Sequence, residues 1–163
     1  MTQILPIAIT ILECDNRYLF IRRQKEPYAG LWGLVGGKVH SGEHIRAAAV
    51  REVMEETGAP EVMDYTFKGT ISERLVGPTG ELLSHFLIFV SRARIDEYQP
   101  HHREGDLSLF GKDDIESERY RFLPSDRRMF ECFEVQCSSA GVYEVEMVQE
   151  NGYRLSYYRK SET

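Results

Sequence analysis

The chain has 163 residues and a formal net charge of −6 at pH 7, from 20 Lys and Arg against 26 Asp and Glu. This length suits one domain that buries its own core, and the negative charge argues against general binding to nucleic acid. No apolar run approaches the roughly 20 residues that a membrane helix needs. We therefore expect a single cytoplasmic domain over residues 1–163, with no membrane and no nucleic-acid partner.

Three cysteines are scattered along the chain at Cys14, Cys132 and Cys137. Neither their spacing nor their odd number suits a metal site or a disulfide framework, so we expect reduced thiols. The apolar N-terminal run lacks the basic leader and the cleavage site of a signal peptide, and Pro6 interrupts it. It is interpreted as a strand of the mature protein.

The first third of the chain predicts a β-hairpin and a glycine-rich loop. Residues 4–11 and 18–21 are apolar and β-branched, and turn formers concentrate at 14–17 between them. The segment 30–39 follows, and its four glycines permit close backbone approaches that a Cβ would block.

A helix is predicted directly after the glycine-rich segment. Ser41 offers an N-cap, and Glu43 would then lie in an acidic first turn. The Ala-rich and Glu-rich run ends at Gly58, with Pro60 just beyond it.

The middle of the chain predicts mainly strands. Residues 65–75 and 82–95 form two candidate strands joined by a turn at 77–80. Residues 96–106 are polar and typical of a loop, and 107–110 are a short apolar strand.

The last third predicts one helix and one hairpin. Residues 125–137 place apolar side chains at helical spacing, whereas 142–158 alternate and turn at 151–152. The order of strands and helices predicts an α/β protein of the mixed α+β kind, in which helices pack on a mixed sheet.

One motif stands out against this background. Gly37 is followed after five residues by Glu43 and, after seven more, by the run Arg51-Glu52-Val53-Met54-Glu55-Glu56-Thr57-Gly58-Ala59. Residues 37–59 match the Nudix box at every position. The box fixes seven residue identities, and at a background frequency of roughly 1 in 15 for each, the odds of a chance match somewhere in this chain are about one in a million. The chain thus resembles the Nudix hydrolases, including MutT-like pyrophosphohydrolases. The lead-in 30–37 also resembles the family, except that Val35 stands where many members carry proline.

The glutamates of this motif share one side of the predicted helix. At 100° per residue, Glu52, Glu55 and Glu56 fall within an arc of about 100°. Three such carboxylates repel one another unless a cation lies among them, and hard oxygen ligands suit Mg²⁺ or Mn²⁺. A solvated acidic face is the alternative interpretation of the glutamates alone.

The resemblance implies an α/β/α sandwich with a metal site. Glu52, Glu55 and Glu56 would coordinate Mg²⁺, with Mn²⁺ as a second possibility, and the carbonyl oxygen of Gly37 would be a further ligand. One carboxylate would serve as the general base, and Glu52 and Glu55 compete for this role with Glu104 in the loop 101–106. For Glu104 the alternative is a solvated loop charge.

Arg51 and Glu43 each admit two interpretations. Arg51 would orient the metal-binding carboxylates, and it also suits an ordinary i, i+4 pair with Glu55. Glu43 lies about 12 Å from Arg51 along a straight helix, so a contact requires extended side chains or a helix that starts after Glu43. Otherwise the negative charge of Glu43 would interact favourably with the N-terminal end of the helix dipole.

Four residues are candidates for substrate binding. Arg22 and Arg23 leave the second strand where resembling enzymes direct cations toward phosphates, and strand alternation lets only one of them face the site. Trp32 would stack on a base or pack against the loop. Asp126 resembles the acidic residue by which purine-triphosphate sanitisers hold the base, and it also suits the first turn of a helix.

The resemblance implies Mg²⁺-dependent cleavage of a nucleoside diphosphate-linked compound at its pyrophosphate bond. Nucleoside triphosphates, ordinary or oxidised, come first as substrates, followed by nucleotide sugars and ADP-ribose. The alternative is a nucleotide-sensing module that does not hydrolyse its ligand, although such modules usually lose box glutamates that this chain keeps. RNA decapping is unsupported, because the chain lacks a basic stripe. The tyrosine-rich hairpin 142–158 would cover a sheet edge or pair with a second subunit in a homodimer.

Overall fold

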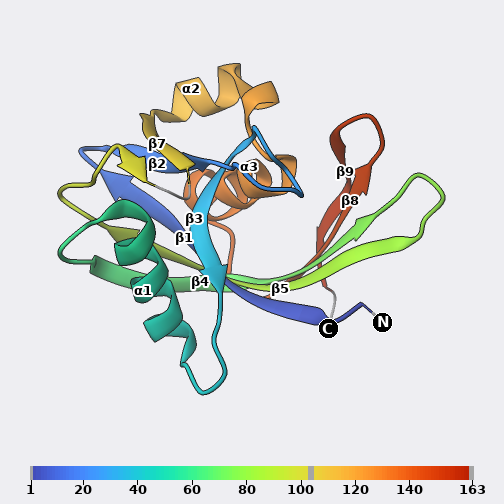
Figure 1. Ribbon diagram of the computed structural model, residues 1–163, viewed down its shortest axis with the longest axis horizontal. Coiled ribbons are helices and arrows are strands. Elements are labelled where there is room, and N and C mark those ends of the chain that lie inside the picture. Colours follow the sequence, from blue (N-terminus) through green and yellow to red (C-terminus); the bar gives the residue numbers. More distant parts are fainter. Residues whose placement is uncertain (1, 103–104, 162–163) are drawn as a thin grey trace.

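The computed structural model, which describes residues 2–102 and 105–161, combines a mixed β-sheet with a small number of helices (Figure 1). Its strands are β1 Ile4–Cys14, β2 Arg17–Arg22, β3 Trp32–Lys38, β4 Met63–Val76, β5 Leu82–Arg94, β6 His101–His102, β7 Gly105–Phe110, β8 Val142–Gln149 and β9 Tyr153–Lys160. Its helices are α1 Ile45–Thr57, α2 Lys112–Ser117, the 3-10 turn η1 Arg119–Arg121, α3 Pro124–Phe130 and its π-helical continuation η2 Glu131–Val135.

The described strands form one sheet in the order β6-β7-β2-β3-β1-β5-β4-β8-β9. The pairs β1–β5 and β4–β8 are parallel, whereas the other neighbours are antiparallel. The three predicted hairpins, β1–β2, β4–β5 and β8–β9, are confirmed. Because β8 pairs with β4, the C-terminal hairpin covers a sheet edge, and β9 becomes the new edge.

Helices pack on both faces of the sheet, because successive side chains of each strand point to opposite sides. Ile11 of β1 belongs to a buried cluster with Phe130 of α3, whereas the next residue, Leu12, belongs to a cluster with Val53 of α1. Figure 1 shows α1 on one side of β3, with α2 and α3 on the other. The expected α/β/α arrangement is confirmed.

The predicted glycine-rich loop is wrong, because these residues form strand β3. β3 pairs with β1 through Gly36 and Ile9, and a Cβ at Gly36 would collide with the carbonyl oxygen of Ala8. Glycine here allows two strands to approach closely rather than giving a loop its freedom. The backbone of β3 is therefore rigidly placed beside the helix that follows it.

Helix α1 begins later than predicted. Its N-cap is His44, which makes no side-chain capping bond, so the prediction of Ser41 as N-cap is wrong. The chain turns before the helix, since the Glu43 N–H donates to the His40 carbonyl oxygen at 3.0 Å. The predicted end is confirmed: Gly58 takes a left-handed φ of 72° and donates to the Met54 carbonyl oxygen.

Three further findings bear on the sequence predictions. The predicted loop 96–106 contains the short strand β6, and α2 was not predicted. All three cysteines are free, with Cys14 and Cys132 buried and Cys137 exposed, which confirms reduced thiols. Across residues 2–102 and 105–161, none of the helices combines the length and the apolar character that crossing a membrane requires.

Candidate active site

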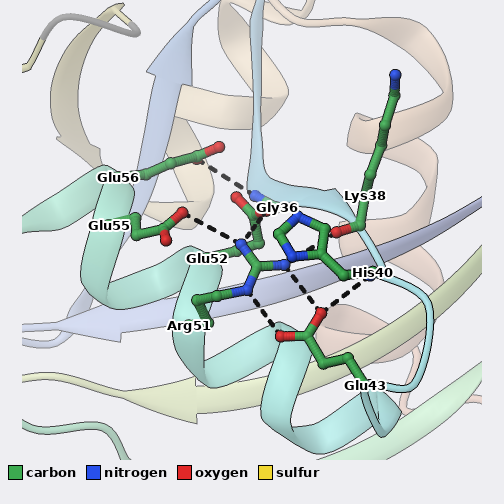
Figure 2. A network of polar contacts seen from close by, with 8 residues as sticks. All are labelled: Gly36, Lys38, His40, Glu43, Arg51, Glu52, Glu55 and Glu56. Carbon is green, nitrogen blue, oxygen red and sulfur yellow. Dashed lines mark hydrogen bonds and ion pairs between the residues drawn. The ribbon is translucent and has the colours of Figure 1, made fainter.

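Arg51, in the middle of α1, gathers the carboxylates of the motif around its guanidinium (Figure 2). Its Nε and Nη2 donate to the two oxygens of Glu43 at 2.7 and 3.0 Å. Its Nη1 donates to Glu52 at 2.8 Å and to Glu55 at 3.1 Å. Its Nη2 also donates to the carbonyl oxygen of Lys38 at 3.0 Å. One planar side chain thus fixes three carboxylates relative to the end of β3.

The contact between Glu43 and Arg51 settles the two interpretations of Glu43. The helix starts at Ile45, after Glu43, so the carboxylate reaches back along the helix to Arg51 and does not lie in the first turn. Hydrogen bonds from Arg51 and from the His40 N–H lower the pKa of Glu43 to about 2. The interpretation of Glu43 as a helix-dipole residue is therefore wrong.

Glu52 lies directly against the backbone of Gly37. A Cβ at Gly37 would fall 2.5 Å from the carboxyl carbon of Glu52 and 2.6 Å from both of its oxygens. A Cβ there would push the Glu52 carboxylate aside, so glycine is what lets the strand end and this carboxylate approach one another. The Glu52 side chain is 12% exposed, so its contacts with Gly37 and Arg51 leave part of it accessible to solvent.

Glu56 and Glu55 flank this contact. Glu56 is buried, and its Oε2 accepts a hydrogen bond from the Gly36 N–H at 3.3 Å. The Glu55 side chain is 60% exposed and is held by Arg51 (Figure 2). In the described part of the chain, no three carboxylate, imidazole or thiolate groups already converge on one point. The three glutamates therefore lie on one side of α1, beside β3, with Arg51 as their shared partner.

The loop that supplied the other candidate base lies partly outside the described residues, and Glu104 is among those not described. His101 is exposed and contacts Asp106 at 3.3 Å. The choice of general base among Glu52, Glu55 and Glu104 stays a prediction.

A second cluster of polar groups is buried behind the sheet. Asp126, in the first turn of α3, turns toward β3, where its Oδ2 accepts a hydrogen bond from the Leu34 N–H at 2.8 Å. Glu73 of β4 is only 3% exposed and lies beside it. Four atoms of this cluster are buried without a hydrogen-bond partner among the described residues: Arg23 Nε, Tyr28 Oη, Glu73 Oε1 and Ser125 Oγ. Such atoms are rare in folded proteins and mark a place where a polar ligand or water is accommodated.

The two buried carboxyls differ in their affinity for a proton. Burial and the neighbouring Asp126 raise the pKa of Glu73 to about 8, an effect that Ser125 and Arg23 partly offset. Burial also raises the pKa of Asp126, to about 6, against the hydrogen bond from Leu34 and the charge of Arg23. These pKa values favour a single proton on the pair at neutral pH, held by Glu73. The pair can donate one hydrogen bond and accept others.

The remaining substrate candidates fall in two groups. Arg23 reaches the buried cluster, with its guanidinium 5.9 Å from the ring centroid of Tyr28, whereas Arg22 is exposed. This agrees with the expectation that only one of the two arginines faces inward. Trp32 packs edge-on against Phe110, with ring centroids 5.2 Å apart. The choice between base stacking and packing for Trp32 stays a prediction.

Sequence reasoning assigned no role to Glu73 and did not consider Tyr28. Glu73 could have been found from alternation, because it shares one face of β4 with the buried residues Ile71 and Leu75. A glutamate in an apolar stripe is a signal of a buried, functional carboxyl. Tyr28 carries no comparable signal, because its burial depends on a distant strand.

Comparisons with known proteins identify the family of the chain. The NUDIX domain profile matches residues 3–131, and the chain belongs to the NUDIX family. An ADP-ribose pyrophosphatase of Methanocaldococcus jannaschii is 38% identical over 81 residues, which are 49% of this chain and 46% of that protein. The nucleoside triphosphatase NudI of Escherichia coli is 32% identical over 91 residues, which are 51% of this chain and 64% of that protein.

A solved structure extends the likeness over nearly the whole chain. The MutT protein from Bacillus halodurans has a TM-score of 0.73 and 25% identity, and the alignment covers 95% of this chain and 96% of that one. The chain spans less than two thirds of the length of the two curated relatives. Nudix hydrolases act on nucleoside diphosphate derivatives and generally use divalent metals.

Proposed function

We propose that this protein is a Mg²⁺-dependent pyrophosphohydrolase of nucleoside triphosphates, ordinary or oxidised, with nucleotide sugars and ADP-ribose as second candidates. The observation that carries this proposal is the approach of the Glu52 carboxylate to the backbone of Gly37, with Arg51 clamping Glu52 and Glu55. A carboxylate held against a strand end by an arginine offers oxygen ligands beside the backbone of that strand.

The residues present fit a divalent cation. Glu52, Glu55, Glu56 and the carbonyl oxygen of Gly37 would hold it, and all of these donors are the hard oxygens that Mg²⁺ prefers, with Mn²⁺ as a close substitute. When bound, the cation neutralises the phosphate oxygens and lowers the pKa of a ligating water. Arg51 positions the carboxylates.

The buried carboxyl pair suits the base of a nucleotide. Charged Asp126 repels phosphate but accepts hydrogen bonds from the N–H groups of a base, while neutral Glu73 donates one to a ring nitrogen or carbonyl. Arg23 is the cation nearest this pair, and the exposed Arg22 is available to phosphate oxygens. We propose that Trp32 supports this pocket by packing. The relatives named as a nucleoside triphosphatase and an ADP-ribose pyrophosphatase define the substrates to compare.

In the reaction, water attacks one phosphorus of the pyrophosphate bridge, and the bond from that phosphorus to the bridging oxygen breaks. A carboxylate among Glu52, Glu55 and Glu104 takes the proton of the water. The products of a triphosphate cleaved between its first two phosphates would be a nucleoside monophosphate and pyrophosphate.

A substrate screen tests the proposal. Release of phosphate, with added pyrophosphatase or phosphatase, is measured with Mg²⁺ over nucleoside triphosphates, oxidised purine triphosphates, nucleotide sugars, ADP-ribose and dinucleoside polyphosphates. Glu55→Gln is assayed alongside, with Glu61→Gln as a control at an exposed glutamate outside the motif. We expect one substrate class to be cleaved, with a loss of at least about a hundredfold in Glu55→Gln alone. If nucleotides bind without cleavage, the protein is a sensing module and the proposal is wrong.

A further inference from the structure

The C-terminal hairpin lies beyond the family match at residues 3–131, yet it contacts the segment that follows β2. The hydroxyl of Tyr153, at the start of β9, accepts a hydrogen bond from the Tyr28 N–H at 3.1 Å. The same hydroxyl donates to a carboxylate oxygen of Glu26 at 3.2 Å. The rings of Tyr28 and Tyr153 meet edge to face, with centroids 4.6 Å apart. One side chain of the hairpin therefore holds two residues of this segment.

Tyr28 needs such support. Its φ of 76° lies in the left-handed region, which a bulky side chain adopts only where its surroundings impose it. Its ring is 4% exposed and belongs to a buried cluster with Leu75 and Met147, against which Tyr153 and Leu155 of the hairpin pack. The hairpin thus supplies both the apolar wall and the hydrogen bond that keep Tyr28 in place.

The position of Tyr28 bears on the buried carboxyl pair through Arg23. The guanidinium of Arg23 lies 5.9 Å from the centroid of the Tyr28 ring. The Tyr28 hydroxyl is buried and lies close enough to Glu73 and Asp126 for their charges to raise its pKa. The segment is closed on itself, since the Arg23 N–H donates to the Leu31 carbonyl oxygen at 2.9 Å. A shift of Tyr28 is therefore passed on to Arg23.

We propose that Tyr153 is a positioning residue of the substrate site: through Tyr28 and Arg23 it holds Glu73 and Asp126 in the arrangement that binds the base of a nucleotide. The C-terminal hairpin is then one of the elements that hold the base-binding residues in place. This inference rests on the proposed function. It assigns Tyr153 to the base side of the substrate and leaves the phosphate side to α1 and β3.

The test uses Tyr153→Phe, which keeps the ring and removes both hydrogen bonds. Tyr157→Phe is the matched control, because Tyr157 lies on the same strand with its ring against Arg159, 4.6 Å away. The values of kcat and KM are measured for the best triphosphate of the screen. Dissociation constants are measured calorimetrically for adenosine and guanosine monophosphate and for inorganic pyrophosphate, all with Mg²⁺.

We expect Tyr153→Phe to raise KM and the dissociation constant of the monophosphate about tenfold, as the loss of one or two hydrogen bonds would. The kcat value and the affinity for pyrophosphate should stay within about twofold of wild type, and the melting temperature within about 2 °C. Glu26→Gln, which weakens the acceptor of the Tyr153 hydroxyl, should raise the same two constants by about threefold. Tyr157→Phe should match wild type.

Two results would overturn the inference while leaving the proposed function intact. One is a Tyr153→Phe variant with wild-type affinity for the monophosphates, and the other is an equal loss of affinity for monophosphate and pyrophosphate. If wild type neither cleaves a nucleotide nor binds a monophosphate, the proposed function fails and the inference fails with it.

Discussion

The carboxylate of Glu52 occupies the space where any residue other than glycine at position 37 would place its Cβ. This relationship ties the helix α1 to the end of strand β3 at one point, and it explains why the motif begins with glycine and continues with a glutamate fifteen residues later. The backbone of residue 37 and a helical carboxylate are brought together by the absence of a side chain.

Replacing Gly37 by alanine should therefore displace Glu52 and remove the activity. We expect a loss of at least about a hundredfold in kcat/KM, because the added Cβ would lie 2.5 Å from the carboxyl carbon of Glu52. The melting temperature should fall by only a few degrees. Gly111→Ala is the control, since its Cβ would meet only a flexible Asp114 oxygen at 3.3 Å. Full activity in Gly37→Ala would show that the close approach has no role.

Arg51 should not be replaceable by lysine. Its guanidinium makes hydrogen bonds to Glu43, Glu52, Glu55 and the Lys38 carbonyl, and a lysine ammonium cannot span these four partners. We expect Arg51→Lys to lower kcat by at least about tenfold and to raise the Mg²⁺ concentration needed for half-maximal activity. Metal titration of the initial rate checks this, and an unchanged half-maximal Mg²⁺ concentration would contradict the orienting role.

The Glu43 contact should stabilise the fold only where Glu43 is charged. The folded pKa of Glu43 is about 2, below its ordinary value of 4.5, so its contribution is present above pH 4.5 and is lost as the pH falls toward 2. Urea unfolding of wild type and Glu43→Gln at pH 7 and at pH 2.5 measures this. The midpoint of wild type should be the higher at pH 7, and the difference should shrink at pH 2.5. A constant difference would mean that charge has no part in it.

Glu73 should make stability depend on pH in the opposite sense. Its folded pKa of about 8 lies above its ordinary 4.5, so its contribution is fully present below pH 4.5 and is lost as the pH rises through 8. Between pH 6 and pH 9, the free energy of unfolding of wild type should fall by about 2–3 kcal/mol more than that of Glu73→Gln, which mimics the neutral acid. Urea denaturation checks this, with the exposed Glu61→Gln as control. Parallel pH profiles of wild type and Glu73→Gln would show that folding does not raise the pKa of Glu73.

The metal-binding helix could be predicted from the sequence because its geometry is local. The spacing of Glu52, Glu55 and Glu56 fixes a shared face on any α-helix, and Gly58 ends the helix where expected. The start of the helix could not be predicted, because the turn at 40–43 depends on the contact of Glu43 with Arg51, eight residues away.

The buried cluster could be predicted only in part, because it is assembled from distant segments. Asp126 and Arg23 were candidates on resemblance, but their proximity to Glu73 depends on how β2, β4 and α3 pack. The link between Tyr153 and Tyr28 spans 125 positions and has no sequence pattern of its own. Tertiary packing alone brings these residues together.

The most direct test of the central claim is the binding of Mn²⁺, followed by electron paramagnetic resonance, to wild type, Glu52→Gln and the control Glu61→Gln. We predict that wild type and Glu61→Gln bind Mn²⁺ equally and that Mg²⁺ competes with it. Glu52→Gln should bind at least about tenfold more weakly and lose activity in parallel. If all three proteins bind Mn²⁺ with the same affinity, Glu52 is not a metal ligand, and the account of this site is wrong.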